Sequence, residues 1–216
     1  MELVKPSFEV EGYVNGFDIL ASIEKAGRTC YKSEEKITVD SSKNFVKSII
    51  KSGHESVIEH EKITVRIICD RGVTHEIVRH RIASYSQEST RYCNYKSKGL
   101  TVIEPFFFIN DEKKYGVWKE VMAFCEKKYN ELIEMGAIPQ EARSVLPNSL
   151  KTEIVVTYNL REWRHFFYLR CSLKAHPQIR EISVPILMEF KKKIPVIFDD
   201  FVIDEEKMTA HIEKLI

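Results

Sequence analysis

The residues best suited to chemistry lie together in one short segment, Arg79–Tyr92, which reads RHRIASYSQESTRY. The segment holds three arginines and one histidine among small hydroxyl side chains. An exposed helix face usually mixes lysine with glutamate, so this composition is unusual for a plain surface. Arginine presents a planar fork of donors that matches phosphate and carboxylate groups, and serine hydroxyls add short donors. The segment therefore indicates an anion pocket, most simply one that binds a nucleotide phosphate.

A second polar cluster, Gly53–His60, contains two histidines and two glutamates. A helix that binds a metal places its histidines four residues apart, but His54 and His60 are six apart. Three interpretations stay open: a metal site, a polar loop in which the histidines make local hydrogen bonds, and a loop that contacts a cofactor.

Two later segments combine cationic and apolar side chains. Arg143 precedes a Leu-Pro pair, and the residues around it favour a position at the surface for this arginine. The segment 158–170 is rich in aromatic residues, which favours core packing, but Arg161, His165 and Arg170 are interspersed among them.

The first segment resembles the signature of the flavin-dependent thymidylate synthases. The matching positions are Arg79, His80, Arg81, Ser84, Ser89 and Arg91. The resemblance also includes Gly53–Ser56 before this signature and Arg143, Asn159–Arg161 and Arg170 after it, and a further family segment is similar to 176–182. Together these matches run from His54 to Glu181 in the expected order and span more than half of the chain.

The resemblance implies the reductive methylation of dUMP to dTMP. Methylenetetrahydrofolate would supply the carbon, reduced FAD the hydride, and NADPH would reduce the flavin. It also implies a homotetramer whose active sites are shared between subunits. From the balanced charge and from the lack of a signal peptide, a membrane span and a metal-ligand spacing, we expect a cytoplasmic protein with no metal, nucleic acid or membrane as a partner. Because no GxGxxG or P-loop motif occurs, FAD is expected to bind outside a Rossmann fold.

The resemblance also assigns residues to each ligand. For dUMP these are Glu76, Arg79, Gln87, Glu88, Ser89, Thr90, Arg91, Arg143 and Arg170. For FAD they are His54, Ser56, Arg79, His80, Arg81, Gln87, Asn159, Arg161 and His165. Arg170 is the expected catalytic residue, because a fixed guanidinium near the N3–C=O edge of the pyrimidine would stabilise negative charge that develops there.

The chain departs from the family at three places. Ser86-Gln87-Glu88 replaces the Asn-Glu-x of many relatives, so which of Gln87 and Glu88 faces the substrate stays open. His165 stands where relatives often have Asn, which leaves one flavin contact open. Glu76 stands where some have Gln, and its carboxylate would disfavour a nearby phosphate but accept from a sugar hydroxyl.

Hydrophobic periodicity predicts the elements that must position these residues. Helices are expected over 17–28, 40–52, 111–135, 160–173 and 177–193, with a short one from Pro139. Strands are expected within 2–14 and over 61–69, 100–104 and 150–158. The fold class is therefore α+β, with a mainly antiparallel sheet flanked by helices.

The segment that carries the arginines is expected to be helical at its start. A turn at 70–72 would lead into a helix from Thr74, which carries Ile77, Val78, Ile82 and Ala83 inward. Arg79 and Ala83 would then share one face, as would His80 and Ser84. The segment 85–95 is expected to be irregular, because Ser, Gln and Thr dominate it.

The bulk composition limits the other possibilities. With 216 residues, 44% apolar and 30% charged, we expect one domain spanning 1–216. The formal net charge of +1 provides no global field for DNA or a membrane, and neither a signal peptide nor a spanning segment is evident.

The five cysteines are irregularly spaced and form no CxxC motif, which argues against disulfides and structural zinc. We expect buried thiols. Cys93 and Cys171 lie nearest to arginines and are the candidates for a nucleophilic thiolate.

Two other functions fit parts of the chain. The arginine-rich segment alone would suit a nucleic-acid-binding module, although the balanced charge weighs against it. His54, Glu55, Glu59 and His60 would suit a metal-dependent nucleotide hydrolase. Flavin colour distinguishes both from the thymidylate synthase.

Overall fold

A computed structural model describes residues 1–96 and 99–213. The chain divides into two compact units that are interleaved in sequence. The first unit comprises Met1–Phe8, Arg66–Arg79 and Tyr85–Val155. The second unit comprises Glu9–Val65, His80–Ser84 and Val156–Ile216. No helix among the described residues is long and apolar enough to cross a membrane.

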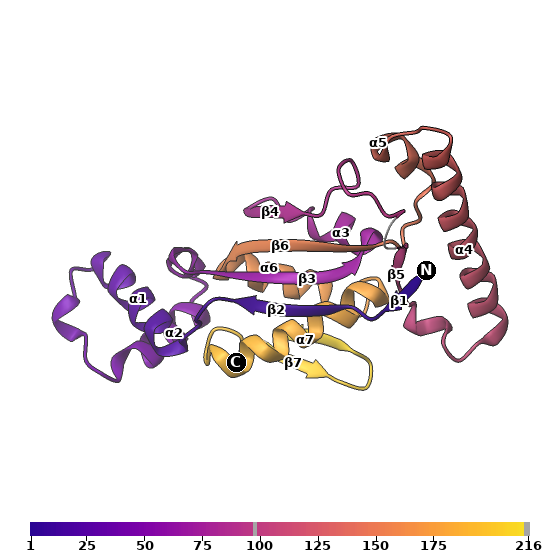
Figure 1. Cartoon of the computed structure of the whole chain (residues 1–216). Coiled ribbons are helices and arrows are strands. Elements are labelled where there is room, and N and C mark those ends of the chain that lie inside the picture. Colours follow the sequence, from indigo (N-terminus) through magenta and orange to yellow (C-terminus); the bar gives the residue numbers. More distant parts are fainter. Residues whose placement is uncertain (97–98, 214–216) are drawn as a thin grey trace. The chain divides into compact units, whose positions relative to one another are not determined.

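Four strands form one sheet in the order β2 (Ser7–Glu11), β3 (Lys62–Asp70), β6 (Lys151–Asn159) and β4 (Ala83–Gln87). Neighbouring strands point in opposite directions (Figure 1), which confirms the prediction of an α+β fold with an antiparallel sheet. Buried and half-buried residues alternate along β3 and β6, as the period of a strand requires.

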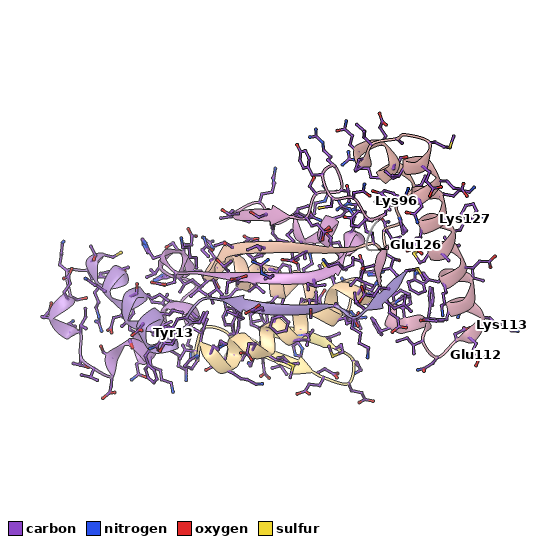
Figure 2. All side chains as sticks on the ribbon, viewed as in Figure 1. Tyr13, Lys96, Glu112, Lys113, Glu126 and Lys127 are labelled. Carbon is purple, nitrogen blue, oxygen red and sulfur yellow. The ribbon has the colours of Figure 1, made fainter. Side chains whose placement is uncertain are left out.

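The first unit contains β1 (Glu2–Val4), which pairs in parallel with β5 (Thr101–Ile103). Its helices are α3 (Arg71–Ile77), η3 (Phe106–Phe108), α4 (Glu112–Glu134), α5 (Pro139–Ala142) and η4 (Arg143–Val145). Leu100, Val102, Met122 and Leu150 form a buried apolar cluster. Glu126 of α4 (Figure 2) joins the helix to this region, because it accepts from the Met1 amino group and from the Leu100 amide.

The second unit contains α1 (Gly16–Thr29), η1 (Glu34–Lys36), α2 (Ser41–Lys51), η2 (Glu55–His60), α6 (Leu160–Arg170) and α7 (Pro177–Lys193). A hairpin of β7 (Phe201–Asp204) and β8 (Thr209–Ile212) follows. Aromatic rings fill its core: Trp163, Phe166, Phe167, Phe190, Phe198 and Phe201. Helices α1 and α2 approach closely at Gly27, where an added Cβ would lie 2.6 Å from the Phe45 ring.

The arginine-rich segment differs from its predicted form. Helix α3 begins at Arg71, three residues earlier than expected, because Asp70 caps it by accepting from the Val73 amide. The helix ends at Ile77, so Arg79 and Ala83 share no helical face, and neither do His80 and Ser84.

The residues after this helix also lie differently. Ile82 is 67% exposed rather than buried. Ala83–Gln87 form β4 at the edge of the sheet, so the prediction that 85–95 is wholly irregular is wrong for its first residues. Its outer serines are compatible with an edge strand that has one exposed face.

Candidate active site

A cavity of about 580 Å³ in the second unit brings together Asn159, Arg161 and His165, three of the residues predicted to contact flavin. All three come from the β6–α6 junction or the first turns of α6. Asn159 is the N-cap of this helix and accepts from the Glu162 amide at 2.8 Å. The end of a sheet strand and the start of a helix therefore present these polar side chains to one space.

The rest of the cavity lining mixes acidic and apolar groups. Glu55 and Glu59 come from η2, and Ile82, Tyr168 and Ile212 supply apolar surface. Arg161 donates to Glu59 at 2.5 Å and lies 3.8 Å from Glu55. Because Arg161 is exposed, these ion pairs are screened by water and cost little to exchange for another anion.

Arg164, in the same helical turn, is buried and bonded to other side chains of the protein. Its guanidinium makes two 2.7 Å bonds to Asp200, and its Nε donates to Glu55 at 3.1 Å. The buried guanidinium is fixed by Asp200, so its bond to Glu55 holds that carboxylate in the cavity wall.

His80 is buried against the same helix and is held at both ring nitrogens. Its Nδ1 lies 2.7 Å from Glu162 Oε1, and Arg170 Nε donates to its Nε2 at 3.2 Å. Since an arginine Nε can only donate, the Nε2 atom is unprotonated and the Nδ1–H donates to Glu162. Burial lowers the pKa of His80, an effect that the Glu162 carboxylate partly offsets, so the ring is neutral near pH 7.

The ligand atoms of His80, Glu162 and His165 lie within 4.8 Å of one another, which is close enough to share a metal ion. The guanidinium of Arg170 at His80 Nε2 opposes this, because a fixed cation repels another. Among the described residues, His54, Glu55, Glu59 and His60 form no such group.

The other predicted flavin residues of the second unit lie beside the cavity along the chain without lining it. His54 precedes η2, Ser56 follows the lining residue Glu55, and Arg81 precedes Ile82. All three side chains are exposed.

Several predicted nucleotide contacts lie close together in the first unit. Arg143 donates to Thr90 Oγ1 at 3.4 Å, and the Arg91 amide donates to Ser89 Oγ at 3.3 Å. Arg143 and Arg91 are both exposed, as a group that binds an anion from solvent must be. This grouping joins residues that are 53 positions apart in the sequence.

Gln87 and Glu88 have different environments. Both carboxylate oxygens of Glu88 are occupied, one by the Tyr95 hydroxyl at 2.9 Å and one by Lys151 at 3.0 Å. Gln87 Nε2 donates to Thr74 at 3.0 Å and to Thr152 at 3.3 Å. Both glutamine and glutamate also line a cavity of about 430 Å³.

The remaining nucleotide residues of this unit lie at the end of α3. Glu76 is half-buried in the helix, and the exposed Arg79 follows it, with its amide bonded to the Glu76 carbonyl. Arg170 lies in the second unit, at the last position of α6.

The cysteines are all free thiols. Burial raises the pKa of Cys171 to about 12, which disfavours the thiolate that a nucleophile needs. Burial likewise raises the pKa of Cys69 and of Cys125.

Sequence reasoning assigned no role to Glu162, Tyr95 or Lys151. The spacing of Asn159 and Glu162 is that of a helix N-terminus with an acidic residue in its first turn, which was a usable signal for the position of Glu162. Nothing local in the sequence indicates the partners of Glu88, which are brought to it by tertiary structure.

Comparisons with known proteins agree with this arrangement. Residues 16–196 match the family model for the thymidylate synthase complementing protein. The chain is 38% identical over 187 residues to the flavin-dependent thymidylate synthase of Geobacter sulfurreducens, with 83% of this chain and 81% of the relative covered. It is 41% identical over 165 residues to that of Pyrococcus abyssi, with 75% and 68% covered.

The structure resembles that of the UMP/dUMP methylase PolB from Streptomyces cacaoi bound with 5-Br dUMP. The TM-score is 0.78 at 22% identity, with 92% of this chain and 96% of that chain covered, so the likeness concerns the fold. The fold and the sequence thus place the chain in one class of enzymes. It belongs to the flavin-dependent thymidylate synthase family.

Proposed function

We propose that this enzyme converts dUMP to dTMP by reductive methylation, with methylenetetrahydrofolate as the carbon donor. NADPH reduces the FAD, and bound flavin in its reduced form supplies the hydride. The observation that carries the proposal is the convergence of Asn159, Arg161 and His165 on one cavity beside His80. Membership of the family favours this function over the nucleic-acid-binding and hydrolase interpretations.

The cavity suits an anionic aromatic cofactor. Its volume, about 580 Å³, lies in the range of small-molecule sites. Ile82 and Tyr168 offer apolar surface to a ring system, and Arg161 offers a fork of donors to a phosphate. Arg164 is paired with the lining residue Glu55, so the charge of Glu55 stays compensated when Arg161 exchanges its carboxylates for a phosphate. His54, Ser56, Arg79 and Arg81 complete the proposed FAD set, with Gln87.

The nucleotide is assigned to a second set of residues. Arg79, Arg91 and Arg143 hold the phosphate and sugar of dUMP, with Ser89 and Thr90 as hydrogen-bonding partners, and Glu76 accepts from a sugar hydroxyl. We place Gln87 rather than Glu88 against the substrate. Both carboxylate oxygens of Glu88 are occupied, whereas the two bonds of Gln87 use only its amide nitrogen.

Arg170 activates the pyrimidine. Its guanidinium stabilises negative charge on the N3–C=O edge, so no cysteine nucleophile is required. The raised pKa of Cys171, the cysteine next to Arg170, supports this assignment.

The same proposal includes a single catalytic domain over 1–216, a homotetramer with shared active sites and a cytoplasmic location. Light scattering on the purified protein tests the assembly. A mass equal to one 25.3 kDa chain contradicts the tetramer.

The absorption spectrum of the purified protein, recorded with added FAD and then dUMP, tests the proposed cofactor. Bound flavin bands that shift with dUMP support a joint site, and dTMP formation should then require FAD, NADPH, methylenetetrahydrofolate and dUMP together. Failure to bind FAD even with excess dUMP contradicts the proposal.

A further inference from the structure

We propose that Glu162 is a positioning residue that, through His80, fixes the orientation of the Arg170 guanidinium. The three side chains form one hydrogen-bonded chain, with 2.7 Å between Glu162 and His80 and 3.2 Å between His80 and Arg170. The inference rests on the proposed function, since it is the role of Arg170 in that reaction that makes its orientation matter.

The chain of bonds has only one consistent arrangement of protons. Arg170 Nε donates, so His80 Nε2 must accept, and the single ring proton of the neutral imidazole lies on Nδ1. The Glu162 carboxylate only accepts, so it favours this tautomer and disfavours the other. Without it, His80 is free to place its proton on Nε2, where it opposes the Nε–H of Arg170.

The bond to Nε determines more than one atom of Arg170. The guanidinium is rigid and planar, so fixing its Nε–H direction fixes the plane in which its other donors lie. Electrostatic stabilisation of developing charge depends on donors that are oriented before the reaction begins.

Helix α6 supplies both ends of this arrangement. Glu162 lies in its first turn and Arg170 is its last residue, and the His80 ring packs between them against Phe166, with ring centroids 5.1 Å apart. His80 is 82 residues from Glu162 and 90 from Arg170 in the sequence, so its ring joins the two ends of the helix from outside.

Burial distinguishes Glu162 from an ordinary helix-capping glutamate. Its side chain is 10% exposed and that of His80 is 2% exposed. A carboxylate withdrawn from water is costly unless a specific partner offsets the cost, and Asn159 already caps the helix. Glu162 is therefore not needed to cap the helix, and its contact with His80 is the interaction that compensates its burial.

The test compares Glu162→Gln with Glu24→Gln. Both replace a buried glutamate of the second unit by its neutral isostere, but Glu24 bonds to Arg28 and Ser41 on α1 and α2. One readout is the tautomer of His80 in flavin-free protein, measured by long-range ¹H–¹⁵N spectra of histidine-labelled, otherwise deuterated samples and assigned with His80→Gln. The other is steady-state kinetics, with kcat for dTMP and KM for dUMP measured separately.

We expect Glu162→Gln to shift His80 away from the pure Nδ1–H tautomer and to lower kcat at saturating FAD by about tenfold, with KM for dUMP nearly unchanged. Glu24→Gln should leave the tautomer and kcat as they are. An unchanged tautomer in Glu162→Gln, or an equal loss of kcat in both variants, overturns the inference.

The two proposals fail separately. If the parent enzyme makes no dTMP, the proposed function is wrong, while a tautomer change confined to Glu162→Gln still supports the hydrogen-bonded chain. If the enzyme makes dTMP and Glu162→Gln keeps full kcat, the proposed function stands and the positioning role is wrong.

Discussion

Arg164 and Asp200 form a two-bond ion pair inside the second unit, with Nη1–Oδ1 and Nη2–Oδ2 distances of 2.7 Å each. The side chains are only 6% and 8% exposed. The pair joins α6, which lines the cavity, to the segment before β7. Glu55 is the other carboxylate bonded to Arg164, so the pair also fixes the guanidinium that holds Glu55.

Replacing Asp200 with Ala should lower the free energy of unfolding by about 3–5 kcal/mol, because it leaves a buried guanidinium without its main partner. Urea unfolding measures this loss. The matched control is Asp199→Ala, which removes an exposed carboxylate one position earlier and should change stability by less than about 0.5 kcal/mol. Equal losses of stability in the two variants would show that the buried ion pair does not stabilise the fold.

Replacing Arg170 with Ala should reduce kcat for dTMP formation by about 10²–10³ fold, the size seen when one donor to a developing charge is lost. FAD binding, followed by absorbance, should be largely kept. Arg180→Ala is the control, since this arginine of the second unit donates to the Lys207 carbonyl and lies outside the cavity lining. Near-normal turnover of Arg170→Ala would exclude the proposed activation.

Gln87→Ala should raise KM for dUMP by roughly tenfold, the effect of about 1.4 kcal/mol of lost hydrogen bonding. Glu88→Gln should have the smaller effect on KM and instead lower thermal stability, because it removes the charge that pairs with Lys151. The reverse ranking of KM values would place Glu88 against the substrate.

The burial of His80 predicts a pH dependence of stability. Its folded pKa lies below the ordinary value of 6.5, mainly because burial disfavours the charged ring. Below about pH 6.5 the unfolded chain binds a proton that the folded chain does not, so the free energy of unfolding falls as pH drops towards the folded pKa. The slope from this residue is at most about 1.4 kcal/mol per pH unit.

Urea unfolding from pH 7.5 to 5 in the parent and in His80→Gln isolates this contribution. The parent should lose more stability on acidification than the variant does. His75→Gln, at an exposed position of α3, should behave like the parent. Identical slopes in the parent and His80→Gln would show that the ring is not held neutral.

Substitution by alanine should have opposite effects on stability at two glycines, because the space around them differs. Gly27→Ala should destabilise by about 1–3 kcal/mol, because its Cβ would lie 2.6 Å from the Phe45 ring. Gly116→Ala should stabilise by about 0.5–1 kcal/mol, because it lies within α4 and an added Cβ has no neighbour within 4 Å. Thermal melts of both variants would reveal a wrong sign.

Elements with strong periodicity could be predicted from the sequence. The helices at 17–28, 111–135 and 177–193 and the strands at 61–69 and 150–158 lie within a few residues of their predicted bounds. Pro177 is the first residue of α7. Asn15 caps α1, which begins at Gly16. Local signals in the sequence are therefore sufficient to place the start of both helices.

The arginine-rich segment was less predictable, because two local signals compete in it. Asp70 caps α3 and moves its start to Arg71. The Ser, Gln and Thr residues after Tyr85 suggest an irregular segment, although the backbone up to Gln87 pairs as the edge strand β4. Pairing with the neighbouring strand decides that Ala83–Gln87 are extended, and the preferences of the individual residues do not predict this pairing.

The candidate site was predictable only where it is local. Asn159, Arg161 and His165 lie within seven consecutive residues and line one cavity, as their spacing allows. The contacts of His80 with Glu162 and of Glu88 with Lys151 join residues 82 and 63 positions apart. Such contacts follow from the fold, and a single sequence does not contain them.

The interleaving of the two units has a consequence for how the chain is made. Once residue 155 has left the ribosome, every segment of the first unit has been synthesised. Residues 9–65 of the second unit cannot complete their packing until 156–213 have been synthesised, because the aromatic core of that unit lies in 156–213. The cavity therefore cannot form before α6 has been synthesised, and a ribosome that stalls before α6 leaves a chain without it.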